Sequence, residues 1–439
     1  MTEQLELTTR FDADAAACGQ AWAADMRLLA ALPPKPARTA HEAALAAQIL
    51  ESCRALRERF LRAHAIELYD RLTAGMSRSL RVDALAYAAA DLVPGLVPTQ
   101  AQVAAEMALA QKDKDGAELD QGVLLAHLLS LPAQGRHLCH AMLLPRPESD
   151  EALARLQRDG AVDLPTASIR RQGRATVVEL RNPRFLNAED EDTLDDFEIA
   201  VDIAIQDTTS VAALRGGVVQ HPKYAGRRIF SAGINLTYLY QGRISFLWYI
   251  RRDLGAMHKL FRGLALPGID VDDPRSQTLE KPWIAAVDTF AIGGGCQILL
   301  VMDYVLAARG AFMTLPARKE GIIPGAANLR LPRFTGERIA RQLITKGRGL
   351  DCDSAEGRLI CDEIAAPDDM DAALATLIED LTDSGAVSLV GNRRALRVGA
   401  EPIDTFRHYM AVYAHEQAIC HFSPQLVRNL ERHWRGAAP

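Results

Sequence analysis

The chain has 439 residues, enough for two or three domains, and its 49% hydrophobic and 24% charged residues are typical of a protein with a sizeable core. A net charge of -6 and a pI of about 6.0 argue against nucleic acid and anionic membranes as partners. No apolar stretch approaches the ~20 residues of a membrane-spanning helix, and the N-terminus lacks the features of a signal peptide. We therefore expect a cytoplasmic protein.

Metal and disulfide frameworks are not indicated by the sequence. The seven cysteines are widely spaced without a C-x-x-C pair, which favours reduced thiols. His137 and His140 in "HLCH" form a lone i, i+3 pair, and a polar helix face explains such a pair better than a metal site does. We expect no metal.

Residues 1–165 are expected to form a helical domain. The stretch "HEAALAAQILESCRALRERFLRAHAIELYDRL" is rich in helix-forming residues, with apolar positions at i, i+3 and i+4. Prolines in "ALPPKPART" and "LVPGLVPTQ" flank this helix, and Thr99 is a plausible N-cap of the next one. No group of chemically reactive residues is evident there, so we interpret this domain as a support for packing or oligomerisation.

From about residue 168, strands alternate with helices, as in α/β proteins. "ATVVELRNP" is predicted to be a strand that ends at Pro183, and a helix with an acidic first turn is predicted in "NAEDEDTLDDFEIAVDIAIQD". One buried strand is expected in "VAALRGGVV", another in "KPWIAAVDTFA" and two short ones in "DYVLAARGAFMTLPA". The last third is expected to be mostly helical.

Three consecutive glycines, Gly293–Gly295, follow an apolar run in "FAIGGGCQILL". Glycine weakens a strand or helix by roughly 0.5–1 kcal/mol, so we expect a sharp turn before a helix. Unpaired N–H groups at such a turn can hold an oxygen that becomes anionic, although tight packing alone would also require glycine. A second small-residue turn, Ser231–Asn235 ("SAGIN"), favours the oxyanion interpretation, because one N–H from each turn could stabilise an enolate.

Four motifs in order, "NPRFLNA", "FSAGINL", "AVDTFAIGGGCQ" and "EGIIPGAANLRL", resemble the crotonase (enoyl-CoA hydratase/isomerase) superfamily. The resemblance implies an α/β fold: a crotonase (ClpP-like) core of ββα units in residues 166–350, after the helical N-terminal domain. Residues 351–439 would form a helical region that completes the acyl-CoA site and oligomer contacts. It also implies a coenzyme A thioester as ligand and a homo-oligomer, either a trimer or a dimer of trimers.

The resemblance also assigns site residues. The backbone N–H groups of Ile234 and Gly294 would form the oxyanion hole. The positions implied to contact the acyl-CoA are Arg184, Glu189, His221, Pro222, Lys223, Tyr224, Gly233, Asn235, Arg252 and Pro324. Lys223, Arg227 and Arg228 could supply charge for the CoA phosphates. As isolated charges, Glu189 and Arg252 would more often lie on solvated helix faces.

Two departures from the superfamily concern its catalytic acids. Hydratases carry one glutamate three residues after the oxyanion glycine and another after the proline of a short strand. The matching positions here are Gln297 and Ala317, and neither side chain can accept a proton at neutral pH. Hydration by the usual pair is therefore not expected, and Gln297 would instead hydrogen-bond a ring hydroxyl or cap a buried polar group.

The segments "FSAGINLTYLYQGRISF", "FAIGGGCQ" and "LPARKEGIIPG" are more similar to the cofactor-free dioxygenases of the superfamily, which serve glycopeptide-antibiotic biosynthesis. This implies conversion of (3,5-dihydroxyphenyl)acetyl-CoA and O₂ to 3,5-dihydroxyphenylglyoxylate and CoA, without metal or flavin. Leu236, Ile322, Ile323 and Pro324 would then line a niche for O₂, although an ordinary core explains them equally well. Alternatives are an isomerase, thioesterase or decarboxylase on another acyl-CoA, or a non-catalytic acyl-CoA-binding scaffold.

Overall fold

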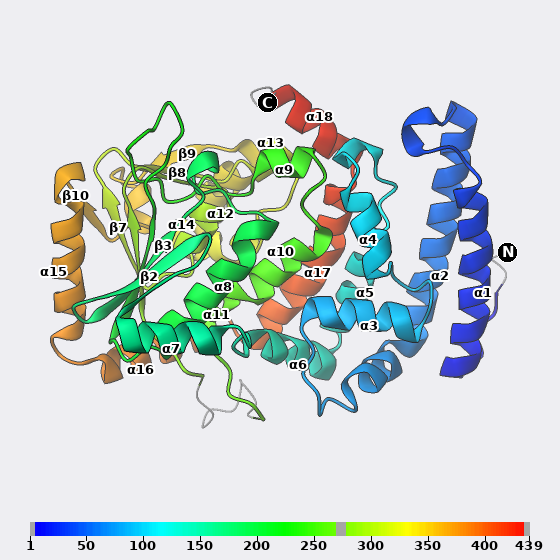
Figure 1. The fold of residues 1–439 in the computed structure, drawn as a ribbon, viewed down its shortest axis with the longest axis horizontal. Helices are drawn as coiled ribbons and strands as arrows, with labels where there is room; N and C mark the ends of the chain where they lie inside the picture. Colours follow the sequence, from blue (N-terminus) through cyan, green and yellow to red (C-terminus); the bar gives the residue numbers. More distant parts are fainter. Residues whose placement is uncertain (1–4, 269–277, 434–439) are drawn as a thin grey trace. The chain divides into compact units, whose positions relative to one another are not determined.

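The computed structural model describes residues 5–268 and 278–433, and the chain divides into two compact units (Figure 1). Unit 1 comprises residues 1–141, 237–250 and 407–439, and unit 2 comprises residues 142–236 and 251–406. Each unit thus combines residues from all three of the consecutive segments expected from the sequence.

Unit 1 is built from helices, some of which continue across the division between the units. The helices are α1 (Phe11–Ala30), α2 (Ala40–Thr73), α3 (Val82–Leu92), α4 (Gln100–Met107), α5 (Leu119–Ser130), α6 (Pro132–Leu143), α9 (Leu236–Tyr240), α10 (Phe246–Leu254), α17 (Ile403–His421) and α18 (Pro424–His433). Thr39 and Thr99 begin α2 and α4 with reciprocal capping boxes, which confirms Thr99 as an N-cap. In the described part of the chain, every helix is too short or too polar to traverse a bilayer.

The C-terminal helix α17 belongs to unit 1 because it packs closely on α5. A Cβ added to Gly122 of α5 would lie 2.4 Å from the Cβ of Ala418 and 2.9 Å from the carbonyl oxygen of Ala414. Only glycine permits this approach of the two helices. The sequence pattern of either helix alone does not reveal the contact.

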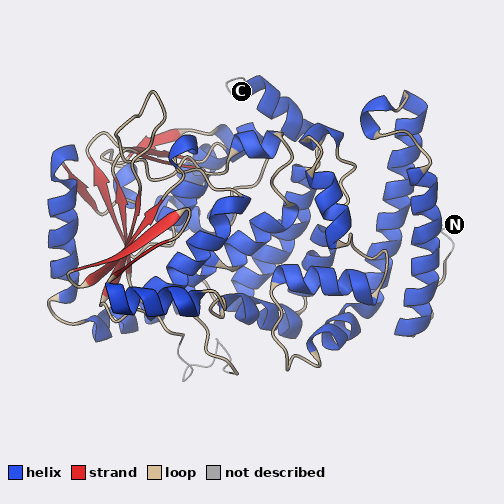
Figure 2. Ribbon diagram, in the orientation of Figure 1, coloured by secondary structure: helices blue, strands red, loops and turns tan. Residues whose placement is uncertain are grey.

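Unit 2 contains two β-sheets, whose strands are red in Figure 2. The strands are β1 (Ala161–Asp163), β2 (Ala167–Gln172), β3 (Ala175–Leu180), β4 (Val211–Gly216), β5 (Trp283–Val287), β6 (Phe290–Ile292), β7 (Tyr304–Ala308), β8 (Phe312–Thr314), β9 (Gly349–Asp351) and β10 (Glu363–Ala365). The larger sheet has the order β1-β2-β3-β4-β5-β7-β10; it is antiparallel from β1 to β3 and parallel from β3 onward. The smaller sheet, β6-β8-β9, pairs β6 with β8 in parallel.

The helices of unit 2 follow the strands and cover them. They are α7 (Ser149–Asp159), α8 (Glu191–Gln206), α11 (Ala256–Arg262), α12 (Gly294–Leu299), α13 (Ala317–Glu320), α14 (Ala327–Arg341), a π-helix (Gln342–Lys346), α15 (Met370–Thr382) and α16 (Ala386–Ala400). Helix α8 packs on β2 and β3, and α15 packs on β7. The central strands β4 and β5 are buried throughout, as expected of parallel strands covered on both faces.

One strand prediction was wrong in detail. The stretch "KPWIAAVDTFA" forms two strands and not one, because the chain leaves the large sheet after Val287 and enters the small sheet at Phe290. Asp288, between them, forms an ion pair with Arg215. The segment expected to be helical as far as residue 165 also includes a short strand, β1, which pairs with β2.

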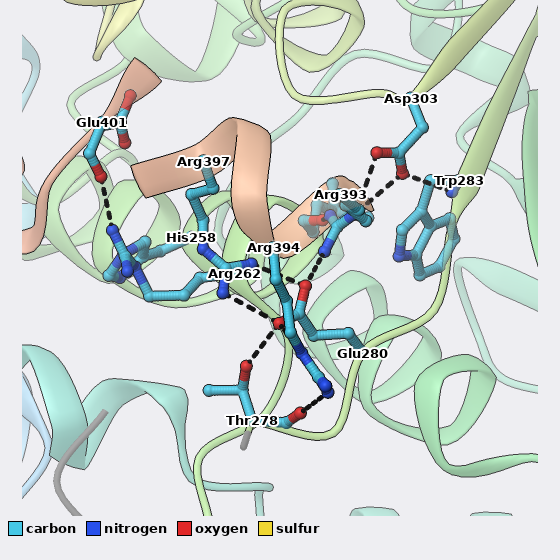
Figure 3. Close-up of polar contacts among 11 residues, drawn as sticks. His258, Arg262, Thr278, Glu280, Trp283, Asp303, Arg393, Arg394, Arg397 and Glu401 are labelled. Atoms are coloured by element: carbon cyan, nitrogen blue, oxygen red, sulfur yellow. Dashed lines mark hydrogen bonds and ion pairs between the residues drawn. The ribbon is translucent and has the colours of Figure 1, made fainter. Parts of the chain in front are cut away.

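Helix α16 is part of unit 2 and is held to the rest of that unit largely by charged groups (Figure 3). Arg393, Arg394 and Arg397 all donate hydrogen bonds to the buried carboxylate of Glu280, at 2.6–2.9 Å. Arg393 also pairs with Asp303 at 2.8 Å. Val387, by contrast, is 90% exposed on the same helix. The contacts of α16 with the rest of unit 2 are therefore mainly polar, and three of its arginines share the buried carboxylate of Glu280.

Candidate active site

The first glycine turn places the N–H of Ile234 where it has no main-chain acceptor. The N–H of Glu189 donates to the carbonyl oxygen of Gly233, and the N–H of Asn235 donates to the carbonyl oxygen of Glu189, both at 2.7 Å. These two bonds form a short parallel bridge around Ile234. Among residues 5–268 and 278–433, no main-chain hydrogen bond uses the Ile234 N–H. The amide is thus available to a ligand.

The second glycine turn begins α12. Gly293 has a φ of +53°, a conformation that favours glycine, and its N–H donates to the carbonyl oxygen of Thr314 at 2.8 Å. Gly294 is the first residue of the helix, so its N–H lies before any intrahelical acceptor. The expected sharp turn before a helix is confirmed.

The two turns lie directly against each other. A Cβ added to Gly233 would lie 2.8 Å from the carbonyl oxygen of Ile292 and 2.9 Å from the amide nitrogen of Gly294. The N–H of Ile292 also donates to the carbonyl oxygen of Ser231 at 2.9 Å. The structure therefore brings the two expected oxyanion turns together, with room only for glycine at their contact.

Glu189, Arg252 and Gln297 form one hydrogen-bonded cluster beside Gly294. Arg252 donates to both carboxylate oxygens of Glu189, and its Nη1 donates to Oε1 of Gln297 at 2.9 Å. Its Nη2 also donates to the carbonyl oxygen of Gly294 at 3.1 Å. A Cβ on Gly294 would lie 2.0 Å from Oε1 of Glu189, so the second turn also requires glycine. Glu189 and Arg252 are 7% and 2% exposed, which rules out solvated helix faces for them.

Sequence reasoning missed two further residues at this cluster, Asp253 and Gly325. Asp253 is buried, and burial raises the pKa of its carboxyl group, although Arg252 and the N–H of Ala326 oppose this effect. A Cβ on Gly325 would lie 2.6 Å from Oε1 of Gln297 and 2.8 Å from Oδ2 of Asp253. Asp253 follows two arginines in a charged run, so the sequence offered no signal that distinguishes it from a surface residue.

Four of the residues expected to contact the acyl-CoA, His221 to Tyr224, lie together in the loop that follows β4. The loop turns at His221, whose carbonyl oxygen accepts from the N–H of Tyr224 at 2.9 Å, and Pro222 and Lys223 are exposed. The ring of Tyr224 contacts Phe290 at a centroid distance of 5.4 Å. Figure 1 places this region in the green part of the chain.

The other residues expected to bind the acyl-CoA differ in their exposure and contacts. Arg228 is engaged by Glu179, which leaves Lys223 and Arg227 as the exposed cations of this loop, and Arg184 is also exposed. The side chain of Asn235 donates to Asp190 at 2.9 Å, the residue that caps α8, so at least one of its donors serves the fold.

The residues expected to form an oxygen niche are all at least half-buried. Leu236, Ile322 and Ile323 are half-buried, and Pro324 is buried. Ile322 and Ile323 lie between α13 and Gly325, the residue that touches Gln297. Their role as an oxygen niche stays a prediction. Within the described residues, no group of three or more His, Cys, Asp or Glu side chains is arranged to hold a metal ion.

Comparisons with known proteins agree with this geometry. Residues 270–416 match the family described as enoyl-CoA hydratase/isomerase. The chain is 48% identical over 394 residues to (3,5-dihydroxyphenyl)acetyl-CoA 1,2-dioxygenase of Amycolatopsis orientalis, covering 89% of each chain. It is 27% identical to a short-chain-enoyl-CoA hydratase of Clostridium acetobutylicum, covering 56% of this chain and 86% of that relative.

A solved structure confirms the expected fold. The crystal structure of an enoyl-CoA hydratase from Mycobacterium avium subsp. paratuberculosis K-10 superposes with a TM-score of 0.51 at 18% identity, covering 63% of this chain and 98% of that one. The sheets and the glycine turns thus belong to a crotonase fold. From its fold and from its 48% identity to the Amycolatopsis protein, the chain belongs to the crotonase (enoyl-CoA hydratase/isomerase) superfamily.

Proposed function

We propose that this protein is a cofactor-independent dioxygenase that converts (3,5-dihydroxyphenyl)acetyl-CoA and O₂ to 3,5-dihydroxyphenylglyoxylate and free CoA. The observation that carries the proposal is the pairing of two adjacent oxyanion turns with the absence of both hydratase glutamates, at Gln297 and Ala317. The 48% identity to a (3,5-dihydroxyphenyl)acetyl-CoA 1,2-dioxygenase supports the same substrate class.

The chemistry begins with an acidic carbon. The α-hydrogens of an arylacetyl thioester are acidic because the carbanion is delocalised over the ring and the carbonyl group. The N–H groups of Ile234 and Gly294 would hold the oxygen as it becomes an enolate oxygen, and the loss of one such donor typically costs ~3 kcal/mol. An electron-rich enolate can reduce O₂ directly. One oxygen atom then forms the keto group, the other enters the carboxylate, and CoA leaves as the thiol.

Arg252 would organise the region around the enolate. It neutralises Glu189 and fixes the Gln297 amide through Oε1, so the Nε2 group of Gln297 is left to donate. A donor at this position suits a ring hydroxyl of the substrate or a developing peroxide oxygen. A glutamate there could instead accept a proton and favour hydratase chemistry.

The proposal is tested by incubating chelator-treated protein with (3,5-dihydroxyphenyl)acetyl-CoA while O₂ and free thiol are followed together. We expect one O₂ consumed for each thiol released, with no added metal or flavin. Thiol release without O₂ uptake would instead identify a thioesterase. Tight binding without turnover would identify a scaffold, and loss of activity with a stoichiometric metal would contradict the cofactor-free assignment.

A further inference from the structure

The proposed reaction needs a base for the α-proton, and neither of the usual superfamily positions supplies one. Gln297 is an amide, and Ala317 is a buried alanine at the start of α13. Glu189 is neutralised through both oxygens by Arg252. Asp253 is buried and forms an ion pair with Arg252 at 3.7 Å, the same arginine that neutralises Glu189. The base must therefore be sought elsewhere around the oxyanion turns.

Residues 314–325 begin against the second glycine turn and end beside Gln297 of α12. At one end, the carbonyl oxygen of Thr314 accepts the N–H of Gly293 at 2.8 Å. At the other end, a Cβ on Gly325 would lie 2.6 Å from Oε1 of Gln297. Glu320 is the one acidic residue in this segment. A carboxylate is thus present on the chain segment that borders the site.

Glu320 lies one helical turn after the vacant position. Residues i and i+3 of a helix are neighbours on one face, so Glu320 lies beside Ala317 on α13. The helix ends at Gly321, whose φ is +92° and whose N–H donates to the carbonyl oxygen of Ala317 at 2.8 Å. Ile322 and Ile323 follow at once. Along the chain, Glu320 therefore lies between the position of the missing glutamate and the expected oxygen niche.

The surroundings of Glu320 suit a base. The side chain is half-buried, and no residue in the described ranges forms a hydrogen bond or an ion pair with its carboxylate. Burial raises the pKa of Glu320 to about 7, which is near the operating pH of a general base. The nearby cations are turned to the π-helix that packs on α13: Arg318 donates to the carbonyl oxygen of Thr345, and Lys319 lies against Gly347. Lys346 is the last residue of the π-helix itself.

We propose, on the basis of the function proposed above, that Glu320 is the catalytic base that removes the α-proton of the arylacetyl thioester. The carboxylate oxygen forms a bond to the proton as the C–H bond breaks, and the electron pair of that bond becomes the enolate. The negative charge moves to the thioester oxygen, which the Ile234 and Gly294 amides hold. Glu320 becomes a neutral acid, which a half-buried position favours.

The test measures α-hydrogen exchange in deuterated buffer without O₂, using phenylacetyl-CoA and (3,5-dihydroxyphenyl)acetyl-CoA. We expect wild type to exchange, with a rate that rises with pH through about 7. Glu320→Gln should lose exchange by ~100-fold or more while thioester binding changes little. Glu337→Gln is the matched control, because Glu337 is an exposed residue that pairs only with the surface residue Arg341 in the described contacts.

A second variant keeps the assignment testable if Glu320→Gln is poorly folded. Glu320→Ala should regain part of its exchange in formate or acetate, because a small carboxylate can occupy the vacated space. Exchange at the wild-type rate in Glu320→Gln, or an unchanged pH step, would overturn the assignment while the proposed function stands. Absence of both exchange and O₂ uptake in wild type would overturn the proposed function, and the assignment with it.

Discussion

Glycine occupies both contact points of the oxyanion turns because any side chain there would collide with the opposite turn. The nearest obstacles to a Cβ on Gly233 are backbone atoms of Ile292 and Gly294, which cannot rotate away. At Gly294 the obstacle is the carboxylate of Glu189. The geometry of the site therefore depends on two residues without side chains.

Gly233→Ala should lower oxygenation by ~100-fold or more, since its Cβ would separate the two amides that hold the enolate oxygen. Gly310→Ala is the matched control: the φ values of the two glycines are +80° and +82°, but Gly310 has open space where a Cβ would lie. Steady-state O₂ uptake of both variants, together with Tm, separates loss of the site from backbone strain. Equal activities of the two variants would contradict the assigned oxyanion hole.

Gln297→Glu should impair oxygenation without creating a hydratase. Arg252 already neutralises Glu189, so a second carboxylate would leave the cluster with excess negative charge beside the enolate. Like charges ~4 Å apart repel by ~1–4 kcal/mol, which predicts a loss of about tenfold or more in kcat. Crotonyl-CoA hydration should stay negligible because Ala317 offers no second base. Strong hydration by this variant would show that the acid at position 297 alone decides the reaction.

The residues of the site could be predicted as far as local sequence encodes them. The turns at Gly233 and Gly294 follow from small residues in short motifs, and the family resemblance that those motifs carry implied Glu189, Arg252 and Gln297. Asp253 could not be predicted, because its burial results from the packing of Gly325 and Ala326, more than seventy positions later in the printed sequence. Contacts over such separations have no local signature.

At the level of elements, α16 shows that polar contacts can attach a helix whose outer face is apolar. Glu280 accepts hydrogen bonds from three arginines of this helix. Burial raises the pKa of Glu280, but the arginines outweigh it and lower the pKa to about 2. Removal of the charge would leave the arginines without their shared partner.

Glu280→Gln should lower the free energy of unfolding at pH 7 by ~3–5 kcal/mol, as expected when one partner of a buried ion pair is removed. Since the folded pKa is depressed, the contribution of Glu280 is complete above its ordinary pKa of 4.5 and is lost as the pH falls toward 2. Denaturant titrations across that range, with hydrogen exchange of α16, would measure both effects. An equal loss in Glu337→Gln, which breaks a surface pair, would refute the special role of Glu280.

Strand and helix positions were predicted more reliably than strand pairing. A run of β-branched residues located β3 and an apolar run located β4, but the sequence could not show that β5 and β6 enter different sheets or that β10 joins the large sheet beside β7. Likewise, the ion pairs between α16 and Glu280 join residues more than one hundred positions apart. Pairing of distant segments is decided by the whole core and not by local pattern.

At the scale of the whole molecule, every residue to which we assign chemistry belongs to unit 2. The oxyanion turns, the Glu189–Arg252–Gln297 cluster, Glu320 and the expected oxygen niche are all encoded between residues 184 and 325. In the proposed reaction, enolate formation and attack on O₂ would use different groups within that stretch. The two steps should therefore be separable by mutation.

Leu236→Asn should impair oxygenation more than enolate formation. A polar side chain would admit water to an apolar niche, whereas the backbone amides of Ile234 and Gly294 would be unchanged. We expect deuterium exchange at the α-carbon to persist and the KM for O₂ to rise. Leu359→Asn, at an exposed leucine, is the control. A proportional fall of both rates would mean that the niche and the enolisation site are not distinct.

We propose that this chain adds both atoms of O₂ to an arylacetyl-CoA without a metal or organic cofactor. The most direct measurement is a single-turnover reaction of chelator-treated protein under ¹⁸O₂, with mass analysis of the glyoxylate and correction for keto-oxygen exchange by a labelled standard. We expect label in both the keto group and the carboxylate, with one CoA thiol released per O₂. Label at one position only, with solvent oxygen at the other, would contradict the account.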